Sequence, residues 1–489
     1  MSNLESYFQE FRKGVIGDDA TYESPFGEKS IVYADWIASG RLHTLIEHQI
    51  ANVFGPFVAN THTEASETGT RMTQAYHYAQ SIIKKHVNAG PDDVIISAGF
   101  GMTAVVNKLI RIMGLRSCGY LSHKTCIKDS EKPVVFITHM EHHSNHTSWL
   151  ETNAEVIIVP PGAGLTVDPN ELKKLMEQYK ERRYKIGAFT ACSNVTGVHT
   201  PYYELAKIMH EYNGLVFVDY AASAPYEDMN MHPGNEMSKL DGIYFSPHKF
   251  MGGPGASGVL LFDSKIYNNK IPDNPGGGTV DWTNPWNEYK YVESIEARED
   301  GGTPGFLQLI RAALAFELKS KMGVENIVKR EKELVLLAFP ALKELPQVRI
   351  LADNITDRLG IISFYIIDIH FNLVVKLLSD RFGIQVRGGC ACAGTYGHYL
   401  LEVSHEKSHE ITDKISHGDL SEKPGWIRWS LHPTTTNQEV FDFVDAVKQI
   451  IVHKSEWEKE YIYDSKKNEF FHKESSDATL NEVKDWFKI

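Results

Sequence analysis

Between Asp92 and Phe262, short apolar runs alternate with longer amphipathic segments. The segments Pro169–Arg182 and Tyr202–Tyr212 have helical spacing, and a proline suits the first turn of a helix because it has no N–H to donate. Apolar strands separated by helices predict a mostly parallel, seven-stranded sheet covered on both faces. The predicted strands are Asp93–Ser97, Pro133–Thr138, Ala154–Pro160, Ile186–Ala191, Leu215–Tyr220, Gly242–Ser246 and Gly258–Phe262.

The pattern changes after about Thr303. Two long helical segments, Phe306–Met322 and Val324–Leu342, precede several strand-like runs and a closing helix at Gln438–Val452. This order predicts a second, smaller α+β domain. The strand-like runs are Val348–Leu351, Gly360–Ile367, Gln385–Gly388 and Trp426–Leu431.

The patterns together predict an α/β protein with four parts. Residues 1–30 form an N-terminal segment that is expected to pack with the small domain, and residues 31–305 form the large domain. Residues 306–453 form the small domain, interrupted by a polar, His- and Lys-rich surface insertion at 395–425. In residues 454–489, charged and aromatic side chains alternate, which predicts an amphipathic C-terminal extension.

Length and charge narrow the class of protein. The chain has 489 residues, more than one ordinary single-core domain. Its 50 Lys and Arg against 63 Asp and Glu give a net charge of −13 without basic blocks, which disfavours nucleic-acid binding. No apolar run approaches the roughly 18 residues that a membrane span needs. Because the first residues lack the basic-then-apolar pattern of a secretory signal, we expect a cytoplasmic location.

The cysteines are few and odd in number, which argues against a disulfide framework. Cys118, Cys126 and Cys192 are scattered and are interpreted as bystanders, although Cys192 adjoins a segment of interest at Ser193. The remaining two, at positions 390 and 392, stand only two residues apart. This pair requires an explanation.

The most informative positions are Asp219 and Lys249. Asp219 ends an apolar strand, and Lys249 lies thirty residues later, just past the next strand, in a turn that precedes a Gly-rich segment. Ligands of open α/β sheets bind at such strand ends. This pair suits pyridoxal phosphate, because a Lys can form a Schiff base with the cofactor and an Asp can keep its ring nitrogen protonated. Taken singly, the Asp could be a helix cap and the Lys a solvated side chain.

Several motifs, taken in order from about Tyr33 to Leu431, resemble the class V (fold type I) pyridoxal-phosphate-dependent aminotransferase family. Within it the chain is most similar to cysteine desulfurases and selenocysteine lyases. The motifs that carry the resemblance are YADWIASGR at 33–41, EHHSN at 141–145, SNVTG at 193–197, the strand-end Asp and Lys, and VRGGCACAGTYGH at 386–398.

The resemblance implies a set of cofactor contacts. The His of EHHSN that stacks on the cofactor ring is His142, with His143 as its rival. The segment Ser97–Asn107 follows a strand and opens a helix, so its free N–H groups would receive a phosphate. The implied cofactor-binding residues are Lys249, Asp219, His142, Asn194, Gly101, Met102, Thr103, Ser246, His248 and Thr303.

The Thr303 assignment also implies an oligomer. GGTPG at 301–305 resembles a loop whose Thr reaches the phosphate across a dimer interface. We therefore expect a homodimer with shared active sites, the commonest symmetric assembly. The alternative is that Thr303 caps the following helix.

One position departs from the family pattern. Related proteins of this group place a Gln three residues after the cofactor Asp, where this chain has Ala222. The usual partner of the ring hydroxyl is therefore missing. Ser223 or a water molecule takes its place, or the chemistry differs.

The loop after Arg387 resembles the one that carries the catalytic cysteine. In the subgroup with a compact loop this Cys follows an Arg by five residues, which assigns the nucleophile to Cys392, with Cys390 second. A nearby Arg and a cofactor-linked cation would lower the thiol pKa. The competing interpretation is half of a metal site. His398, His405, His409 and His417 follow, but no second closely spaced Cys pair does.

Arg428 is the expected partner of the substrate carboxylate, since a guanidinium matches a carboxylate in bidentate fashion. It alternates with Ile427 and Trp429 and should face the other side of its strand. A structural ion pair is the alternative. Arg387 is a second candidate, and Asn194 is expected near the same carboxylate.

The predicted function is a pyridoxal-phosphate-dependent, cysteine desulfurase-like reaction. It would convert L-cysteine or selenocysteine to L-alanine and hold the sulfur on Cys392 as a persulfide for an acceptor protein. Fold alone does not fix the reaction. The alternatives are a class V aminotransferase or carbon–sulfur lyase without persulfide chemistry, and a non-catalytic sulfur-carrier or metal-binding protein.

Overall fold

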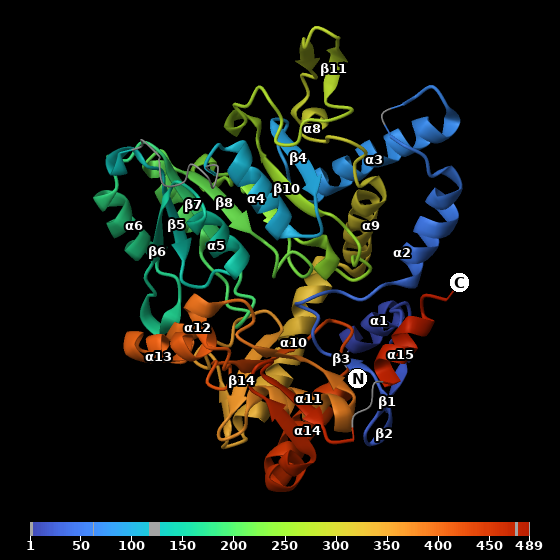
Figure 1. Ribbon diagram of the computed structural model, residues 1–489, viewed down its shortest axis with the longest axis vertical. Coiled ribbons are helices and arrows are strands. Elements are labelled where there is room, and N and C mark those ends of the chain that lie inside the picture. Colours follow the sequence, from blue (N-terminus) through green and yellow to red (C-terminus); the bar gives the residue numbers. More distant parts are fainter. Residues whose placement is uncertain (1–2, 62, 117–127, 475–477, 489) are drawn as a thin grey trace.

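The computed structural model describes residues 3–61, 63–116, 128–474 and 478–488. Cys118 and Cys126 lie outside the described residues. Figure 1 shows a large sheet with its helices in the upper part of the molecule and a smaller sheet with helices below it. Among the described residues, no helix is both long and apolar enough to cross a membrane.

The large sheet has seven strands in the order β4-β10-β9-β8-β7-β5-β6, and each lies where the apolar runs predict it. All pairings among β5 to β9 are parallel, whereas β10 runs antiparallel to both of its neighbours. The predicted mostly parallel α/β sheet is therefore confirmed. The strands are β4 (Asp93–Ala98), β5 (Val134–Thr138), β6 (Glu155–Val159), β7 (Lys185–Thr190), β8 (Leu215–Asp219), β9 (Gly242–Phe245) and β10 (Gly258–Asp263).

Successive strand residues enter two different apolar cores, because side chains of a strand alternate between the faces of its sheet. In β8, Val216 and Val218 join one core and Phe217 the other. The first core is completed by α3 (Glu67–His86), α6 (Pro169–Gln178), α7 (Tyr202–Glu211) and α9 (Phe306–Met322). The second is completed by α4 (Met102–Ile112) and α5 (His143–Leu150).

The smaller sheet is antiparallel, in the order β13-β14-β17-β16. One face packs on α10, α11 and α14 through a separate apolar core. The predicted closing helix extends beyond its predicted end, to Trp457. The elements are β13 (Val348–Ile350), β14 (Ile361–Ile366), β16 (Arg387–Gly389), β17 (Trp426–Ser430), α10 (Val324–Lys343), α11 (Phe371–Phe382) and α14 (Asn437–Trp457).

The N-terminal residues lie against the smaller sheet and its helices. Arg12 forms an ion pair with Glu439 of α14, and the Tyr22 hydroxyl donates to the Ser379 carbonyl of α11. The short strand β3 (Val32–Tyr33) pairs in parallel with β15 (Ile384–Gln385). The other elements of this part are α1 (Asn3–Arg12), β1 (Thr21–Ser24) and β2 (Gly27–Ser30), whereas α2 (Thr44–His48) packs on α9.

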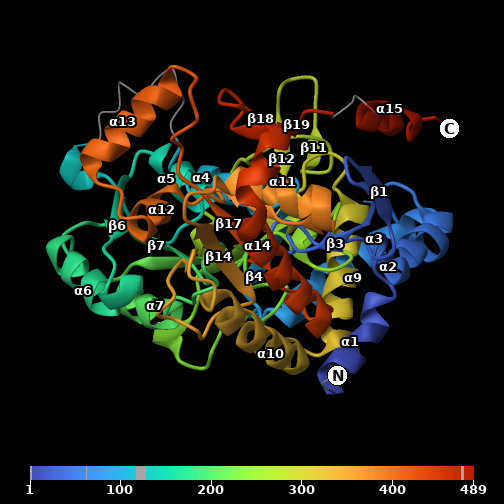
Figure 2. The same cartoon turned by 90° about the horizontal axis from the view of Figure 1, so that it is seen from below.

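The remaining segments form additions to this frame. The chain beyond α14 forms a hairpin of β18 (Tyr461–Asp464) and β19 (Glu469–His472), which lies beside α11 in Figure 2. The polar stretch after β16 forms α12 (Gly394–Leu400) and α13 (His405–Ser416). A second hairpin and two short helices complete the list: β11 (Val280–Thr283), β12 (Tyr289–Tyr291), α8 (Ile295–Arg298) and α15 (Ala478–Asp485).

Candidate active site

The sequence motifs meet at one edge of the large sheet. Because β10 is antiparallel to both β4 and β9, the strands β4, β5, β7, β8 and β9 all point the same way, and their carboxyl ends share an edge. A cavity of about 210 Å³ lies there, which we call the inner cavity. Among the predicted residues, those that line it are Met102, Thr103, His142, Asn194, Asp219, Ser246, His248, Lys249, Arg387, Cys392 and Arg428.

Asp219 and Lys249 face this cavity from neighbouring strand ends. Asp219 is buried, and its Oδ1 accepts a hydrogen bond from the Ala221 N–H at 2.8 Å. Burial raises the pKa of Asp219 to about 6, and Lys249 opposes that shift. Burial lowers the pKa of Lys249 to about 8, and Asp219 opposes that shift. The cavity therefore holds a carboxylate and an amine that can be unprotonated near neutral pH.

The start of α4 forms a cradle for an anion. Gly101 caps this helix without a side chain, and the Met102 N–H donates to Ser246 Oγ at 2.8 Å. A Cβ at Gly101 would stand 3.1 Å from that Oγ and 3.5 Å from the His248 ring. Thr103 Oγ1 lies 2.7 Å from the Ser144 hydroxyl. These donors at a helix N-terminus fit the phosphate of pyridoxal phosphate.

The two histidines of EHHSN have different surroundings. His142 lines the inner cavity and caps α5, and its Nδ1 accepts from the Ser144 N–H at 3.1 Å. Burial lowers the pKa of His142 to about 3, so its ring is neutral and suited to stacking. His143 instead contacts the cysteine loop, where its Nε2 accepts from the Gly394 N–H at 2.8 Å. This geometry favours His142 over its rival.

The segment that carries His142 is anchored by Glu141, a residue that the sequence reasoning did not single out. Its Oε1 accepts from the Thr138 hydroxyl at 2.7 Å and the Thr190 N–H at 2.9 Å. Its Oε2 accepts from Asn145 Nδ2 at 2.7 Å. These bonds join the ends of β5 and β7 beneath the cavity. The signal in the sequence was an acidic residue three positions after the end of a mostly apolar strand.

Arg428 faces the inner cavity while its neighbours Ile427 and Trp429 pack in the core of the smaller sheet. The predicted side of the strand is therefore correct. Asp35 forms an ion pair with Arg428 at 2.9 Å and with Arg387 at 3.0 Å. Among the described residues, the buried Arg428 Nε has no hydrogen-bond partner. The ion pair with Asp35 agrees with the structural interpretation of Arg428. The Nε without a partner agrees with the ligand interpretation, because it can donate to a substrate carboxylate.

Asp35 itself was missed, although it lies within YADWIASGR. It lies two residues after the end of β3, and the pairing of β3 with β15 places it beside the two arginines. Only the tertiary structure joins residues that are more than 350 positions apart in the chain.

The cysteine pair lies on a tight turn that follows β16. The Ala393 N–H donates to the Cys390 carbonyl at 3.0 Å, and both central residues, Ala391 and Cys392, have positive φ values of 48° and 56°. The large domain holds this turn by its backbone, because Asn194 Nδ2 donates to the Ala391 carbonyl at 2.8 Å. Cys392 lines the inner cavity and Cys390 does not, which favours the predicted nucleophile.

Two further expectations are corrected or narrowed. Thr303 is exposed and does not line the inner cavity of its own chain. The cap of α9 is Gly305, so the interpretation of Thr303 as a helix cap is wrong.

Ala222 lines the cavity, whereas Ser223 is fully buried and does not line it. Ser223 is therefore not in place to replace the missing Gln.

The cysteines and histidines do not gather into a metal site in the part of the chain that the structure describes, where no three His, Cys, Asp or Glu side chains converge as ligands. Cys192 is part of the lining of the inner cavity but is itself buried, and burial raises its pKa well above the ordinary value. A thiol of this kind stays protonated and unreactive.

The chain is similar to known proteins in both sequence and structure. A probable cysteine desulfurase from Halalkalibacterium halodurans is 28% identical over 372 residues, which are 74% of this chain and 84% of that protein. One from Staphylococcus epidermidis is 26% identical over 78% of this chain and 87% of its own. A cysteine desulfurase structure from Thermococcus onnurineus superposes with a TM-score of 0.72 at 20% identity, covering 91% of this chain and 98% of that one.

The family profile gives the decisive match. The description "Aminotransferase class-V" fits residues 32–443, which contain every predicted site residue. Members of this family are pyridoxal-phosphate-dependent enzymes, and the strand-end amine, carboxylate and anion cradle fit that cofactor. The chain belongs to the class V aminotransferase family of pyridoxal-phosphate-dependent enzymes.

Proposed function

We propose that this enzyme is a cysteine desulfurase, which converts L-cysteine or selenocysteine to L-alanine and takes the sulfur onto Cys392 as a persulfide. The observation that carries the proposal is that Cys392 lines the same cavity as Lys249 and Arg428. A thiol, an amine with a lowered pKa and a guanidinium then face one small ligand. The relatives named cysteine desulfurase support the same reaction.

Each residue has a physical role in this reaction. Arg428 binds the substrate carboxylate through its free Nε, and Asp35 fixes the orientation of the guanidinium. Lys249 removes the Cα proton as an amine whose burial leaves it partly unprotonated at neutral pH. Asp219 would hold the ring nitrogen of pyridoxal phosphate and the α4 cradle would hold its phosphate, and the bound cofactor would supply the electron sink.

Cys392 completes the reaction. Its thiolate attacks the substrate sulfur, the carbon–sulfur bond breaks, and the alanine carbon receives a proton. The positive φ at Cys392 places an L-residue in a conformation that costs roughly 1–2 kcal/mol. Such strain occurs where the surrounding structure aims a side chain at a ligand.

The test is to supply the holoenzyme with L-cysteine and a reductant and to measure alanine and sulfide. Peptide mass spectrometry of Cys392 without reductant should find one added sulfur atom. Cys392→Ser should abolish both the adduct and steady-state sulfide release. Retention of full sulfide release by this variant would refute the nucleophile assignment.

A second candidate reaction is transamination or carbon–sulfur lysis without a persulfide. Ala222 favours it, because this cavity wall has no amide where related proteins hold the ring hydroxyl. A screen of amino acids with keto-acid acceptors distinguishes the two reactions. Transfer of the amino group to a keto acid at a rate above alanine formation from L-cysteine would favour the second.

The exposed position of Thr303 supports a homodimer in which each subunit contributes this residue to the other subunit's site. Mixing Lys249→Ala with Thr303→Ala subunits should restore activity, since one site of each mixed dimer then has both residues. We also propose a cytoplasmic location, where Cys390 and Cys392 stay reduced, and a sulfur-acceptor protein or small thiol as the partner.

A further inference from the structure

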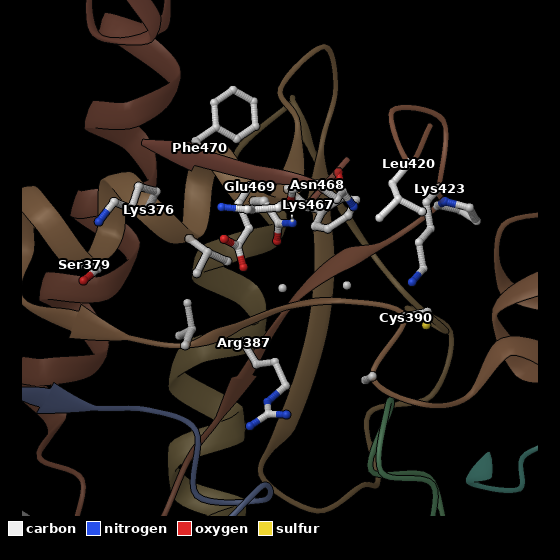
Figure 3. Close-up of a pocket in the computed structure, with 18 of the residues that line it drawn as sticks. Lys376, Ser379, Arg387, Cys390, Leu420, Lys423, Lys467, Asn468, Glu469 and Phe470 are labelled. Atoms are coloured by element: carbon white, nitrogen blue, oxygen red, sulfur yellow. Dashed lines mark hydrogen bonds between the residues drawn. The ribbon is translucent and has the colours of Figure 1, made fainter. Parts of the chain in front are cut away.

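A second cavity of about 620 Å³ also borders the cysteine turn, and we call it the outer cavity. The two cavities share Arg387, Ala391 and Cys392 in their walls. Figure 3 shows Arg387 and Cys390 on one side of the outer cavity and residues 467–470 on the other. The cysteine turn is therefore a partition between two spaces.

Two segments to which the sequence assigns no function form the wall facing this partition. Leu420 and Lys423 come from the end of the insertion after β16, and residues 467–471 come from the β18–β19 hairpin. The hairpin is fixed to α11, since the Tyr461 hydroxyl donates to Asp380 Oδ2 at 3.1 Å and Asn372 Nδ2 donates to the Asn468 carbonyl. These additions thus enclose a space beside Cys390.

The two cysteines have different access. Cys392 lines both cavities, whereas Cys390 lines only the outer one. Cys390 is half-buried, and Cys392 is exposed. They stand at the first and third positions of a single turn that is closed by the Ala393–Cys390 hydrogen bond of 3.0 Å. A sulfur atom on Cys392 therefore stands in the same turn as a second thiol, which lines the outer cavity and not the inner one.

The outer cavity is basic. Its lining contains Lys376, Arg387, Lys423 and Lys467 and one acidic residue, Glu469. The first two have carboxylate partners in Asp380 and Asp35. The other two lysines belong to the insertion and to the hairpin. A cavity with this charge attracts small anions, and its volume is that of a small-molecule site.

We propose that Cys390 takes the transferable sulfur from Cys392 and passes it to a small anionic thiol in the outer cavity. This inference rests on the proposed desulfurase function, since it requires a persulfide on Cys392. It gives the second cysteine, the insertion and the C-terminal hairpin a common purpose. The substrate side and the acceptor side are then separated by one turn of chain.

The transfer needs no external oxidant. The Cys390 thiolate attacks the terminal sulfur of the Cys392 persulfide, a new sulfur–sulfur bond forms, and the Cys392 thiolate leaves. Cys390 then carries the persulfide, and Cys392 is ready for another substrate. The acceptor thiolate attacks the terminal sulfur on Cys390 in the same way and leaves as a small-molecule persulfide, which regenerates the Cys390 thiolate.

The first experiment locates the sulfur. The holoenzyme receives one equivalent of L-cysteine, and the peptide that contains both cysteines is fragmented in a mass spectrometer. We expect the added sulfur on Cys390 in the natural enzyme and on Cys392 in Cys390→Ser. With excess glutathione as the acceptor, Cys390→Ser and Cys390→Ala should turn over at least about tenfold more slowly.

Three outcomes would overturn the relay. Sulfur found on Cys392 alone in the natural enzyme, with equal glutathione turnover in Cys390→Ser, shows direct transfer. A Cys390–Cys392 disulfide with release of hydrogen sulfide shows attack on the wrong sulfur atom. If Cys390→Ser loses alanine formation in the first turnover to the same extent as it loses glutathione turnover, the substitution has a structural effect. Absence of both alanine and persulfide in the natural enzyme would instead refute the proposed function itself.

The second experiment tests the acceptor side. Lys423→Gln and Lys467→Gln should each raise the KM for glutathione about fivefold, because the cavity loses positive charge. The KM for 2-mercaptoethanol, which is uncharged, should stay constant. Lys174→Gln, an exposed lysine of α6, is the matched control and should change neither value. Equal changes in the KM values for both thiols, or no change in either, would refute an anionic acceptor in this cavity. Rapid sulfur transfer only to an added protein acceptor would also refute it.

Discussion

Two regions of the inner cavity are built in opposite ways. Asp219 ends β8 and Lys249 follows β9, two largely buried strands in the middle of the large sheet, where two apolar cores fix the backbone. Cys392 lies at the surface, on a turn with two consecutive positive φ values, and hydrogen bonds to backbone atoms hold that turn against the large domain.

This difference matches what each region has to do. The strand-end groups must keep shifted pKa values, and only burial provides the low dielectric that maintains them. The cysteine must reach a substrate on one side and an acceptor on the other, so burial would defeat its purpose. A strained but anchored turn gives exposure together with a fixed position.

The largest effect is expected from Lys249→Ala, which removes the proton-transferring amine from the rigid region. Turnover of L-cysteine should fall by at least about 10³-fold. The visible absorption band of the covalently attached cofactor should also disappear. Lys265→Ala, an exposed lysine after β10, is the control and should retain both. Persistence of the band in the Lys249→Ala variant would contradict the cofactor assignment.

Arg428→Lys should be next in size, because a lysine keeps the charge but loses the planar fork that matches a carboxylate. The kcat/KM for L-cysteine should decrease about 100-fold, mostly through KM. Arg349→Lys, an exposed position of β13, provides the comparison at an arginine of the same sheet. A normal KM in the Arg428 variant would mean that this residue serves the ion pair with Asp35 alone.

His142 makes the rigid region sensitive to acid. Its pKa is about 3 in the folded protein against 6.5 when unfolded, so the unfolded chain binds more protons between these values. Stability is therefore retained above pH 6.5 and lost as the pH falls towards 3. At pH 5 the loss from this residue should be about 2 kcal/mol.

His142→Asn keeps a capping side chain and removes the titrating group. Urea unfolding at pH 7.5 and pH 5 should show a smaller acid loss in this variant than in the natural protein. His453→Asn, at an exposed position of α14, should leave the acid loss unchanged. Identical pH profiles for the natural protein and His142→Asn would exclude a neutral, buried ring at this position.

The smallest effect belongs to the turn itself. Ala391→Gly relieves an L-residue at a positive φ of 48°, so the free energy of unfolding should rise by about 0.5–1 kcal/mol. Ala393→Gly, at a negative φ of −136° and fully buried, should lower it instead. Urea midpoints measure both. A loss of stability in Ala391→Gly would show that the turn carries no strain, and the contrast between the two regions would disappear.

Much of this architecture follows from local pattern. The apolar runs locate all seven strands of the large sheet, since strands covered on both faces are predominantly apolar. Placing Asp219 and Lys249 at strand ends then brings them to one edge, because parallel strands share that edge. The alternation around Arg428 likewise predicts which side of β17 it faces.

Other features depended on contacts between distant parts of the chain. Three such features are the direction of β10, the position of Asp35 between two arginines, and the enclosure of a second cavity by the hairpin. Each involves residues that are far apart in the sequence and that no local pattern of apolar and polar positions connects. The cysteines show the division most clearly. Their spacing in the sequence identified a pair, whereas only the tertiary structure placed one thiol against both cavities and the other against one, because the turn is positioned by Asn194 and His143 of the large domain.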